Sequence, residues 1–377
     1  MPVTDDIAFD PDWFSKPGDT IVSLMERRQV TPCDLGGVIG GGMDTLRGIL
    51  AGSITIDAPL ARDLSNALGG SADFWLRRQA NYDRALDRVV RVATESEGER
   101  WLELVPFPGR QPRARPGVDG RMDAVRRRLV FFDVNNLRTW TTRYGSVRSD
   151  TQFRTSPTLV SNEGAVAVWL RRGELDAALV VTRPWDADAL RGRLDEIRAL
   201  SRIGQPSRFL PKLRDILASV GVALVVVRAP TGCRASGAMR PLASGKRMLL
   251  LSFRFRADDQ FWFTVFHELG HLLLHDGQTF VDDEETLQDG REQEANAFAR
   301  DCIVLPQLRA EFERLLPSRK SILRFSVYAG ISAGLTVGQM QHGRMIGHEQ
   351  FNSLKRRWTW DEIEPALGYP GVMSAPR

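Results

Sequence analysis

The chain has 377 residues, of which 42% are hydrophobic and 26% charged, so it has the composition of a globular protein with two or three domains. A formal net charge of +4 does not indicate a chain that binds nucleic acid over its whole surface, and three scattered cysteines exclude a cysteine-held zinc site. No apolar stretch reaches about 18 residues and the amino terminus lacks a secretory signal, so we expect a cytoplasmic protein without a membrane span.

Residues 14–82 predict a bundle of short helices. Thr31 is a suitable N-cap, Pro32 suits the first helical position and Asp34 the third. This helix ends at the glycine run 40–42, and a second helix follows as far as Gly52. A helix, a glycine turn and another helix are the layout of a helix-turn-helix domain.

The amino-terminal segment closes with Phe74-Trp75-Leu76, Gln79, Asn81 and Tyr82. This ending resembles the lambda-repressor-like domain of antitoxins. The resemblance implies a helix-turn-helix domain whose second helix offers Met43, Thr45 and Arg47 to DNA. Gly48 inside that helix costs about 1 kcal/mol relative to alanine, and Gly42 replaces the usual polar N-cap. DNA binding and the docking of a protein partner therefore both stay open.

Residues 94–205 predict a linker followed by a helical connector. Proline, glycine and arginine are dense between residues 106 and 117, which is typical of an exposed segment. From residue 166 to residue 177 the apolar residues recur at helical spacing. We therefore expect helices that connect the two ends of the chain.

Residues 206–306 predict a small sheet followed by helices. The runs 222–227 and 247–251 are apolar and are bounded by glycine and proline, which indicates strands. An edge strand of such a sheet can pair with an extended substrate, and residues 237–239 are candidates for a position near that edge. Helices are again expected over residues 307–377. The predicted fold class is therefore α+β and mostly helical.

Five histidines occur in the chain, and His267, His271 and His275 fall within nine residues. His267 and His271 are spaced i and i+4 in a helix-compatible run, so both imidazoles can face one metal ion. Glu268 follows the first histidine, where a carboxylate can act as general base on a water molecule. This pattern is that of a zinc-dependent peptidase, and such a donor set also accepts manganese.

A catalytic zinc site usually has a third protein ligand, which we expect from a helix over residues 291–305. Glu294 is the preferred candidate because it lies beside the buried stripe that begins at Ala295, and Glu292 is the competitor. His275 lies one turn beyond His271, and we interpret it as a helix-terminal residue or an outer contact of a ligand.

The motif His267-Glu268-Leu-Gly-His271, followed by Glu294-Ala-Asn-x-Phe-Ala, resembles the ImmA/IrrE family of metallopeptidases. The resemblance implies a zincin-like domain with the metal ligands His267, His271 and Glu294 and the catalyst Glu268. It also implies a protein substrate, a helix-turn-helix repressor or antitoxin, whose cleavage controls transcription. The alternative is a DNA-binding antitoxin-like regulator whose peptidase-like half senses a signal or binds a partner. A homodimer stays open.

Overall fold

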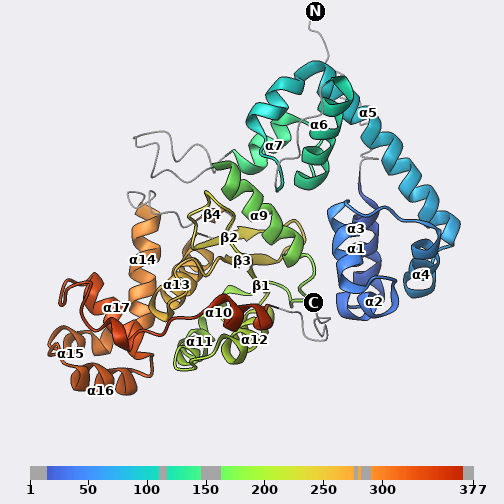
Figure 1. Cartoon of the computed structure of the whole chain (residues 1–377). Helices are drawn as coiled ribbons and strands as arrows, with labels where there is room; N and C mark the ends of the chain where they lie inside the picture. Colours follow the sequence, from blue (N-terminus) through green and yellow to red (C-terminus); the bar gives the residue numbers. More distant parts are fainter. Residues whose placement is uncertain (1–14, 110–116, 146–162, 276–278, 282–289, 368–377) are drawn as a thin grey trace, which may run out of the picture. The chain divides into compact units, whose positions relative to one another are not determined.

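The computed structural model describes residues 15–109, 117–145, 163–275, 279–281 and 290–367 (Figure 1). The chain divides into two compact units, Met1–Arg143 and Tyr144–Arg377. The second unit therefore contains the predicted zincin-like region, the predicted carboxy-terminal region and the last part of the predicted connector. Among the described residues, no helix has the length and apolar content to cross a membrane.

The first unit is helical. Its elements are α1 (Pro17–Arg28), α2 (Pro32–Val38), α3 (Gly42–Ala51), α4 (Ala58–Leu68), α5 (Ala72–Leu104), α6 (Val118–Phe132) and α7 (Leu137–Tyr144), whose last residue opens the second unit. The predicted start of α2 is confirmed, because the Thr31 side chain accepts a hydrogen bond from the Asp34 N–H and Pro32 is the first helical residue. Gly41, at φ 79°, forms the turn between α2 and α3.

Helix α5 differs from the sequence-based prediction of a linker from residue 94. The helix continues to Leu104, although Glu97 has non-helical backbone angles. Its buried residues Val90, Ala93 and Trp101 pack the helix into the unit, beside α6. This burial stabilises helix in a stretch that we predicted to belong to the linker. The predicted arginine-rich part of the linker falls partly on residues 110–116, outside the described residues.

The second unit is built on a four-stranded sheet with the order β1-β3-β2-β4. Strands β1 (Val222–Val226) and β3 (Arg247–Leu251) are parallel, while β2 (Gly237–Pro241) is antiparallel to β3. The short strand β4 (Phe280–Val281) pairs with Ala238 and Met239, so β2 has a neighbour on both sides. The two predicted strands are thus confirmed, and the predicted α+β, mostly helical class is confirmed with them.

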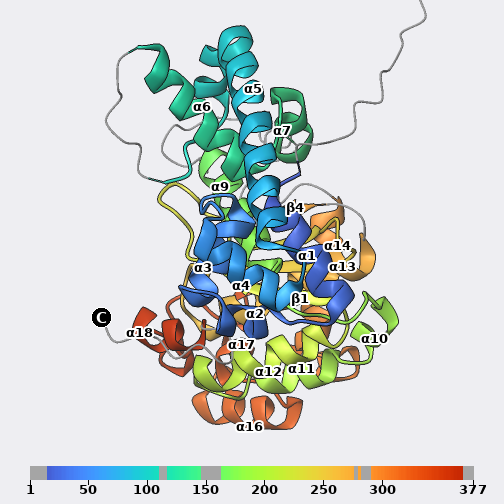
Figure 2. The same cartoon turned by 90° about the vertical axis from the view of Figure 1, so that its right-hand side faces the viewer.

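Helices cover both faces of this sheet. Leu224 and Leu249 belong to the main core with α12 (Pro206–Ala218) and α13 (Asp258–Leu274), whereas Val225 and Leu250 pack on the side of α9 (Glu163–Ala177). Figures 1 and 2 show α9 and α12 on opposite sides of the sheet. Alternate residues of a strand face opposite sides, so strands that are apolar throughout are the expected result of two covered faces.

The remaining helices of the second unit pack into the same main core. They are α10 (Ala187–Arg191), α11 (Leu194–Leu200), α14 (Gly290–Ile303), α15 (Arg309–Glu313), α16 (Arg319–Ala329), α17 (Ala333–His342) and α18 (Trp360–Ile363). In the described part of this unit three short 3-10 helices accompany them, η1 (Pro306–Leu308), η2 (Asn352–Leu354) and η3 (Glu364–Ala366). Residues after 306 therefore complete the core around α13 and do not form a separate compact unit.

The start of α13 is held in place from two sides. Phe209 of α12 packs against Phe261 and Trp262 with ring centroids 5.3 and 5.2 Å apart. The carboxy-terminal segment contributes a backbone hydrogen bond from Asp258 N to Arg356 O, 3.0 Å long, and a second from Trp358 N to Arg256 O, 2.8 Å long. The helix that carries the histidine motif is therefore anchored at its first turn.

Candidate metal centre

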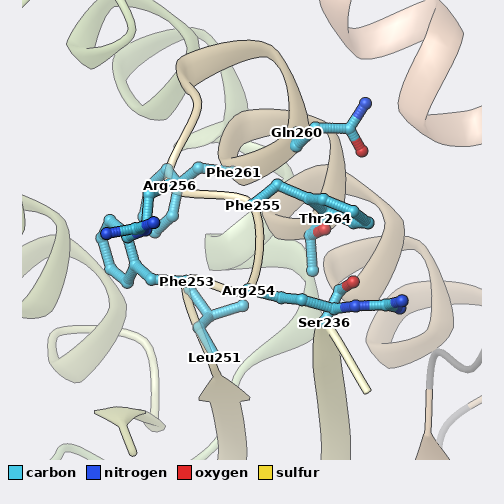
Figure 3. Close-up of a pocket in the computed structure, with 9 residues that line it drawn as sticks. All are labelled: Ser236, Leu251, Phe253, Arg254, Phe255, Arg256, Gln260, Phe261 and Thr264. Atoms are coloured by element: carbon cyan, nitrogen blue, oxygen red, sulfur yellow. The ribbon is translucent and has the colours of Figure 1, made fainter. Parts of the chain in front are cut away.

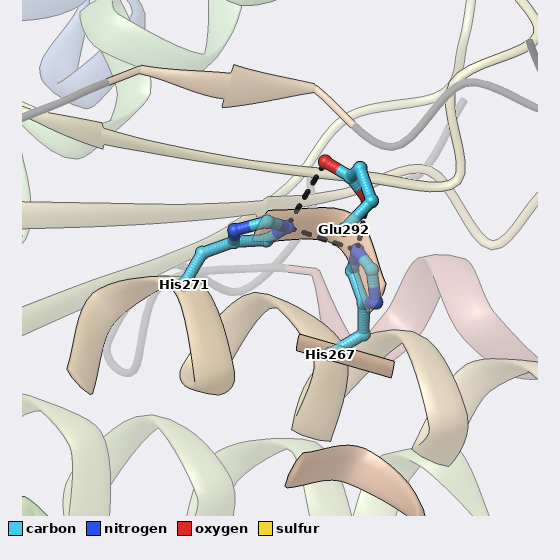
Figure 4. Close-up of side chains that lie close together, drawn as sticks. All are labelled: His267, His271 and Glu292. Carbon is cyan, nitrogen blue, oxygen red and sulfur yellow. Dashed lines mark hydrogen bonds and ion pairs between the residues drawn. The ribbon is translucent and has the colours of Figure 1, made fainter. Parts of the chain in front are cut away.

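Helix α13 brings His267 and His271 together inside the protein. Their side chains are almost fully buried, and their Nε2 atoms lie 3.1 Å apart. Glu292 of α14 completes the group, with Oε2 3.1 Å from Nε2 of His267 and Oε1 3.2 Å from Nε2 of His271 (Figure 4). The three residues together are a cluster with metal-ligand chemistry.

The spacing of these three donors fits a small divalent ion. In a tetrahedral zinc site with metal–nitrogen bonds of about 2.0–2.1 Å, neighbouring donor atoms lie about 3.3 Å apart. The two Nε2 atoms lie 3.1 Å apart, and each lies 3.1–3.2 Å from its nearer carboxylate oxygen, Oε2 for His267 and Oε1 for His271. These separations are close to that value. Two imidazoles and one carboxylate leave a fourth position for water or substrate, as catalytic zinc sites do.

Glu292, and not Glu294, joins the histidines. The carboxylate of Glu294 points away from the pair, is 64% exposed and accepts a hydrogen bond from His275. The sequence-based choice of Glu294 as third ligand is therefore corrected to Glu292, because residues two apart on a helix are rotated by about 200°.

A signal for this assignment exists in the sequence of α14. The buried residues of the helix are Glu292, Ala295, Ala299 and Ile303, which follow one another at i, i+3, i+7 and i+11. Extending the alanine stripe backwards by three residues reaches Glu292 and misses Glu294. The small residues also let the helices approach, since a Cβ on Gly270 of α13 would lie 3.3 Å from the Cα of Ala295.

The protonation states of Glu292 and His271 suit metal binding. Burial would raise the pKa of Glu292, but hydrogen bonds from His267 and His271 outweigh it and hold the pKa at about 2. Burial lowers the pKa of His271, and the hydrogen bond to Glu292 offsets only part of this effect. Near neutral pH the site therefore offers an ionised carboxylate and a neutral imidazole, which are the forms that bind metal ions.

Both histidines make a second contact through their other ring nitrogen. Nδ1 of His267 lies 3.1 Å from Oδ1 of Asn296, and Nδ1 of His271 lies 3.1 Å from Nδ1 of His275. His275 is the C-cap residue of α13, as the sequence-based interpretation of a helix-terminal residue expects. These contacts orient the two imidazole rings so that both Nε2 atoms face Glu292.

Glu268 lies beside the histidines, at the contact between α13 and β2. Its side chain is fully buried, and the backbone of Gly237 in β2 passes directly over it. A Cβ on Gly237 would lie 2.6 Å from Oε1 of Glu268 and 2.6 Å from Cγ2 of Thr264. The strand can approach this carboxylate only because residue 237 is glycine.

A cavity of about 270 Å³ opens at the histidine cluster and extends between α13 and α17. His267 and Glu292 line one part of it, and Phe263 and Leu335 contribute apolar walls. His342 of α17 also lines the cavity, with its ring centroid 6.4 Å from that of Phe263. This position of His342 was not predictable from local spacing, because His342 lies 71 residues after His271 in the sequence.

The segment between β3 and α13 lines a small neighbouring pocket (Figure 3), and its Phe255 also lines the cavity at the histidine cluster. Phe253 and Arg256 adopt left-handed backbone conformations, with φ 52° and 50°. Phe253 stacks on Phe261 at a centroid distance of 4.4 Å. Phe255, which lies between Phe253 and Arg256 in the sequence, is 41% exposed. The unusual backbone thus directs Phe253 into the core and leaves Phe255 beside the cavity.

The residues predicted to contact DNA behave differently from one another. Met43 is buried at 7% exposure and packs against Gly36, so its predicted contact with DNA is wrong. Thr45 is half-buried in α3. Arg47 forms an ion pair of 3.0 Å with Asp44, which is on the same helix. The hydrophobic packing of α3 on α2 decides the inward direction of Met43.

Residues 224–336 match the family model Peptidase_M78, described as the IrrE N-terminal-like domain. This stretch carries a peptidase-family domain. It spans β1 to α17 and contains His267, Glu268, His271 and Glu292. The match supports the ImmA/IrrE metallopeptidase family and suggests a metal-dependent protease. The comparison with curated proteins found no match.

Proposed function

We propose that this chain is a metal-dependent endopeptidase in which His267, His271 and Glu292 hold a zinc ion. The observation that carries the proposal is the buried group of two imidazole nitrogens and one carboxylate, with donor separations of 3.1–3.2 Å. Manganese is the second candidate, because nitrogen and oxygen donors suit both ions. A bound ion of this kind supplies Lewis acidity, which lowers the pKa of water and polarises a carbonyl group.

Glu268 is proposed as the general base and acid. Its carboxylate takes the proton of the attacking water and then passes it to the nitrogen of the leaving amine. Complete burial next to the backbone of β2 keeps bulk water away from this carboxylate. Exclusion of water strengthens the electrostatic interactions on which the reaction depends.

The substrate is proposed to be a protein, a helix-turn-helix repressor or antitoxin whose loss changes transcription. The cavity supports a polypeptide substrate, because it extends from the histidine cluster along α13 and has both apolar and polar walls. Leu335 and Phe263 offer packing surface for a side chain, while Gln339 and Thr264 offer hydrogen bonds.

Cleavage tests this function. Wild type and Glu268→Gln, each with zinc or manganese, would be incubated with the repressor or antitoxin encoded beside this gene, and the products measured by intact mass. We expect one cut by the wild type and a rate lower by roughly 10²–10⁴-fold for Glu268→Gln, which keeps the metal. Glu292→Ala is expected to lose both metal and cleavage. Absence of cleavage by a metal-loaded wild type would contradict the proposal.

The second candidate function is DNA-binding regulation by the first unit. The observation that favours it is the pair α2 and α3, joined by a tight glycine turn within a compact helical unit. Arg47 and Thr45 remain proposed contacts with DNA. If Arg47→Ala reduces binding to operator DNA while Glu268→Gln leaves repression unchanged, these results would support regulation by DNA binding and would count against proteolysis.

A further inference from the structure

A chain of polar contacts leads from the histidine cluster to the protein surface. Nδ1 of His271 lies 3.1 Å from Nδ1 of His275, and Nε2 of His275 lies 2.8 Å from Oε2 of Glu294. The His275 side chain is 7% exposed and that of Glu294 is 64% exposed. This series of contacts therefore begins at the buried imidazole of His271 and ends at the carboxylate of Glu294, which is in contact with water.

Metal binding determines which nitrogen of each imidazole in this series of contacts carries a proton. A neutral imidazole that binds an ion through Nε2 carries its proton on Nδ1. His271 must then donate from Nδ1 to the unprotonated Nδ1 of His275. His275 in turn carries its proton on Nε2 and donates it to the carboxylate of Glu294. Both hydrogen bonds have a defined direction, and every donor has an acceptor.

The other histidine has an outer partner of a different kind. Nδ1 of His267 faces the side-chain oxygen of Asn296, which is a neutral acceptor. Of these two outer contacts, the one behind His271 continues to a carboxylate, so negative charge reaches that imidazole through a second ring. A carboxylate behind a ligating histidine fixes the orientation of the ring and raises the basicity of the ligand.

We infer that His275 and Glu294 are positioning residues that hold His271 in the orientation and tautomer that binds the metal ion. The inference rests on the metal site of the proposed function, but it does not depend on peptide cleavage. Glu294 thus has a role at the site without being one of the three residues proposed to bind the ion, the third of which is Glu292. Loss of either positioning residue should weaken metal binding without removing a ligand.

A purely structural role makes a different prediction. The His275–Glu294 pair joins the end of α13 to the first turns of α14, so its removal could merely loosen the contact between two helices. In that case each substitution would lower the stability of the metal-free protein. A positioning role instead lowers metal affinity and requires the two residues to act in series.

The test is the zinc affinity of the full chain, measured by competition with a chromogenic chelator. Glu294→Ala and His275→Phe are each expected to lower the affinity about 10–100-fold. The double variant should bind no more weakly than His275→Phe alone, because Glu294 acts only through the imidazole. Glu294→Gln keeps an acceptor oxygen and should recover part of the affinity. Gln293→Ala, an exposed neighbour on α14, is the control and should bind as the wild type does.

The possible results separate the two proposals. An affinity of Glu294→Ala within twofold of the wild type, or additive losses in the double variant, would overturn the positioning role. Equal melting temperatures of the metal-free proteins, together with the expected affinities, would support it. A wild type that binds zinc and shows these losses but does not cleave protein would overturn the peptidase alone. A wild type that binds neither zinc nor manganese would overturn both.

Discussion

Replacement of Gly237 by alanine tests how β2 and α13 share the space around Glu268. The new methyl carbon would lie 2.6 Å from Oε1 and 2.8 Å from Cγ of Glu268, and 2.6 Å from Cγ2 of Thr264. All three separations are far below ordinary contact, which is about 3.5–4.0 Å between carbon atoms. Gly237 has strand geometry, so the backbone itself accepts alanine and the effect comes from crowding.

The structure leaves little room for Gly237 and Glu268 to move apart and relieve this crowding. Gly237 is paired with Leu251 of β3 in the sheet, and Glu268 is fully buried in α13. Overpacking of a buried site costs about 1–3 kcal/mol of unfolding free energy. A shift of about 1 Å in a catalytic group lowers the rate on the order of 10²-fold. The three proposed metal ligands lie outside the clash, so zinc affinity should change little.

Three measurements on Gly237→Ala check this reasoning: urea unfolding, zinc affinity and the rate of substrate cleavage. Gly37→Ala is the matched control, because a Cβ at Gly37 meets no atom within 4 Å. The expected pattern for Gly237→Ala is lower stability, retained zinc and a slower reaction. A variant that cleaves at the wild-type rate and unfolds within about 0.5 kcal/mol of wild type would refute the geometry of this contact.

Two further predictions concern stability. Burial raises the pKa of Asp258 to about 6, so this group contributes stability below about pH 4 that is lost as the pH rises to about 6. Asp258→Asn should therefore gain stability over the metal-free wild type as the pH rises from 4.5 to 7, by on the order of 2 kcal/mol, and equal differences in urea unfolding at both pH values would contradict this. Phe209→Ala should lose about 3–5 kcal/mol, because the ring is fully buried against three aromatic residues. Tyr328→Ala, at 64% exposure, is its control and should stay within about 0.5 kcal/mol in the same unfolding assay.

Features that depend on short stretches of chain were predictable from the sequence. The spacing of His267 and His271 places both imidazoles on one face of any helix, so their approach needs no knowledge of the fold. The cap at Thr31 and the apolar strands 222–226 and 247–251 are local in the same way. At the end of α5, where we predicted a linker from residue 94, the burial of Trp101 decided in favour of helix.

Only the tertiary structure decided which distant residues join the histidines. Glu292 and Glu294 are chemically alike. The alanine stripe of α14 favours Glu292, and the packing of α14 against α13 brings its carboxylate to the histidines. His342 lies 74 residues after Glu268 in the sequence, and Gly237 lies 31 residues before it. Neither has a local signal that links it to the site. The physical reason is that spacing along one helix is set by backbone geometry, whereas contacts between elements are set by how their surfaces pack.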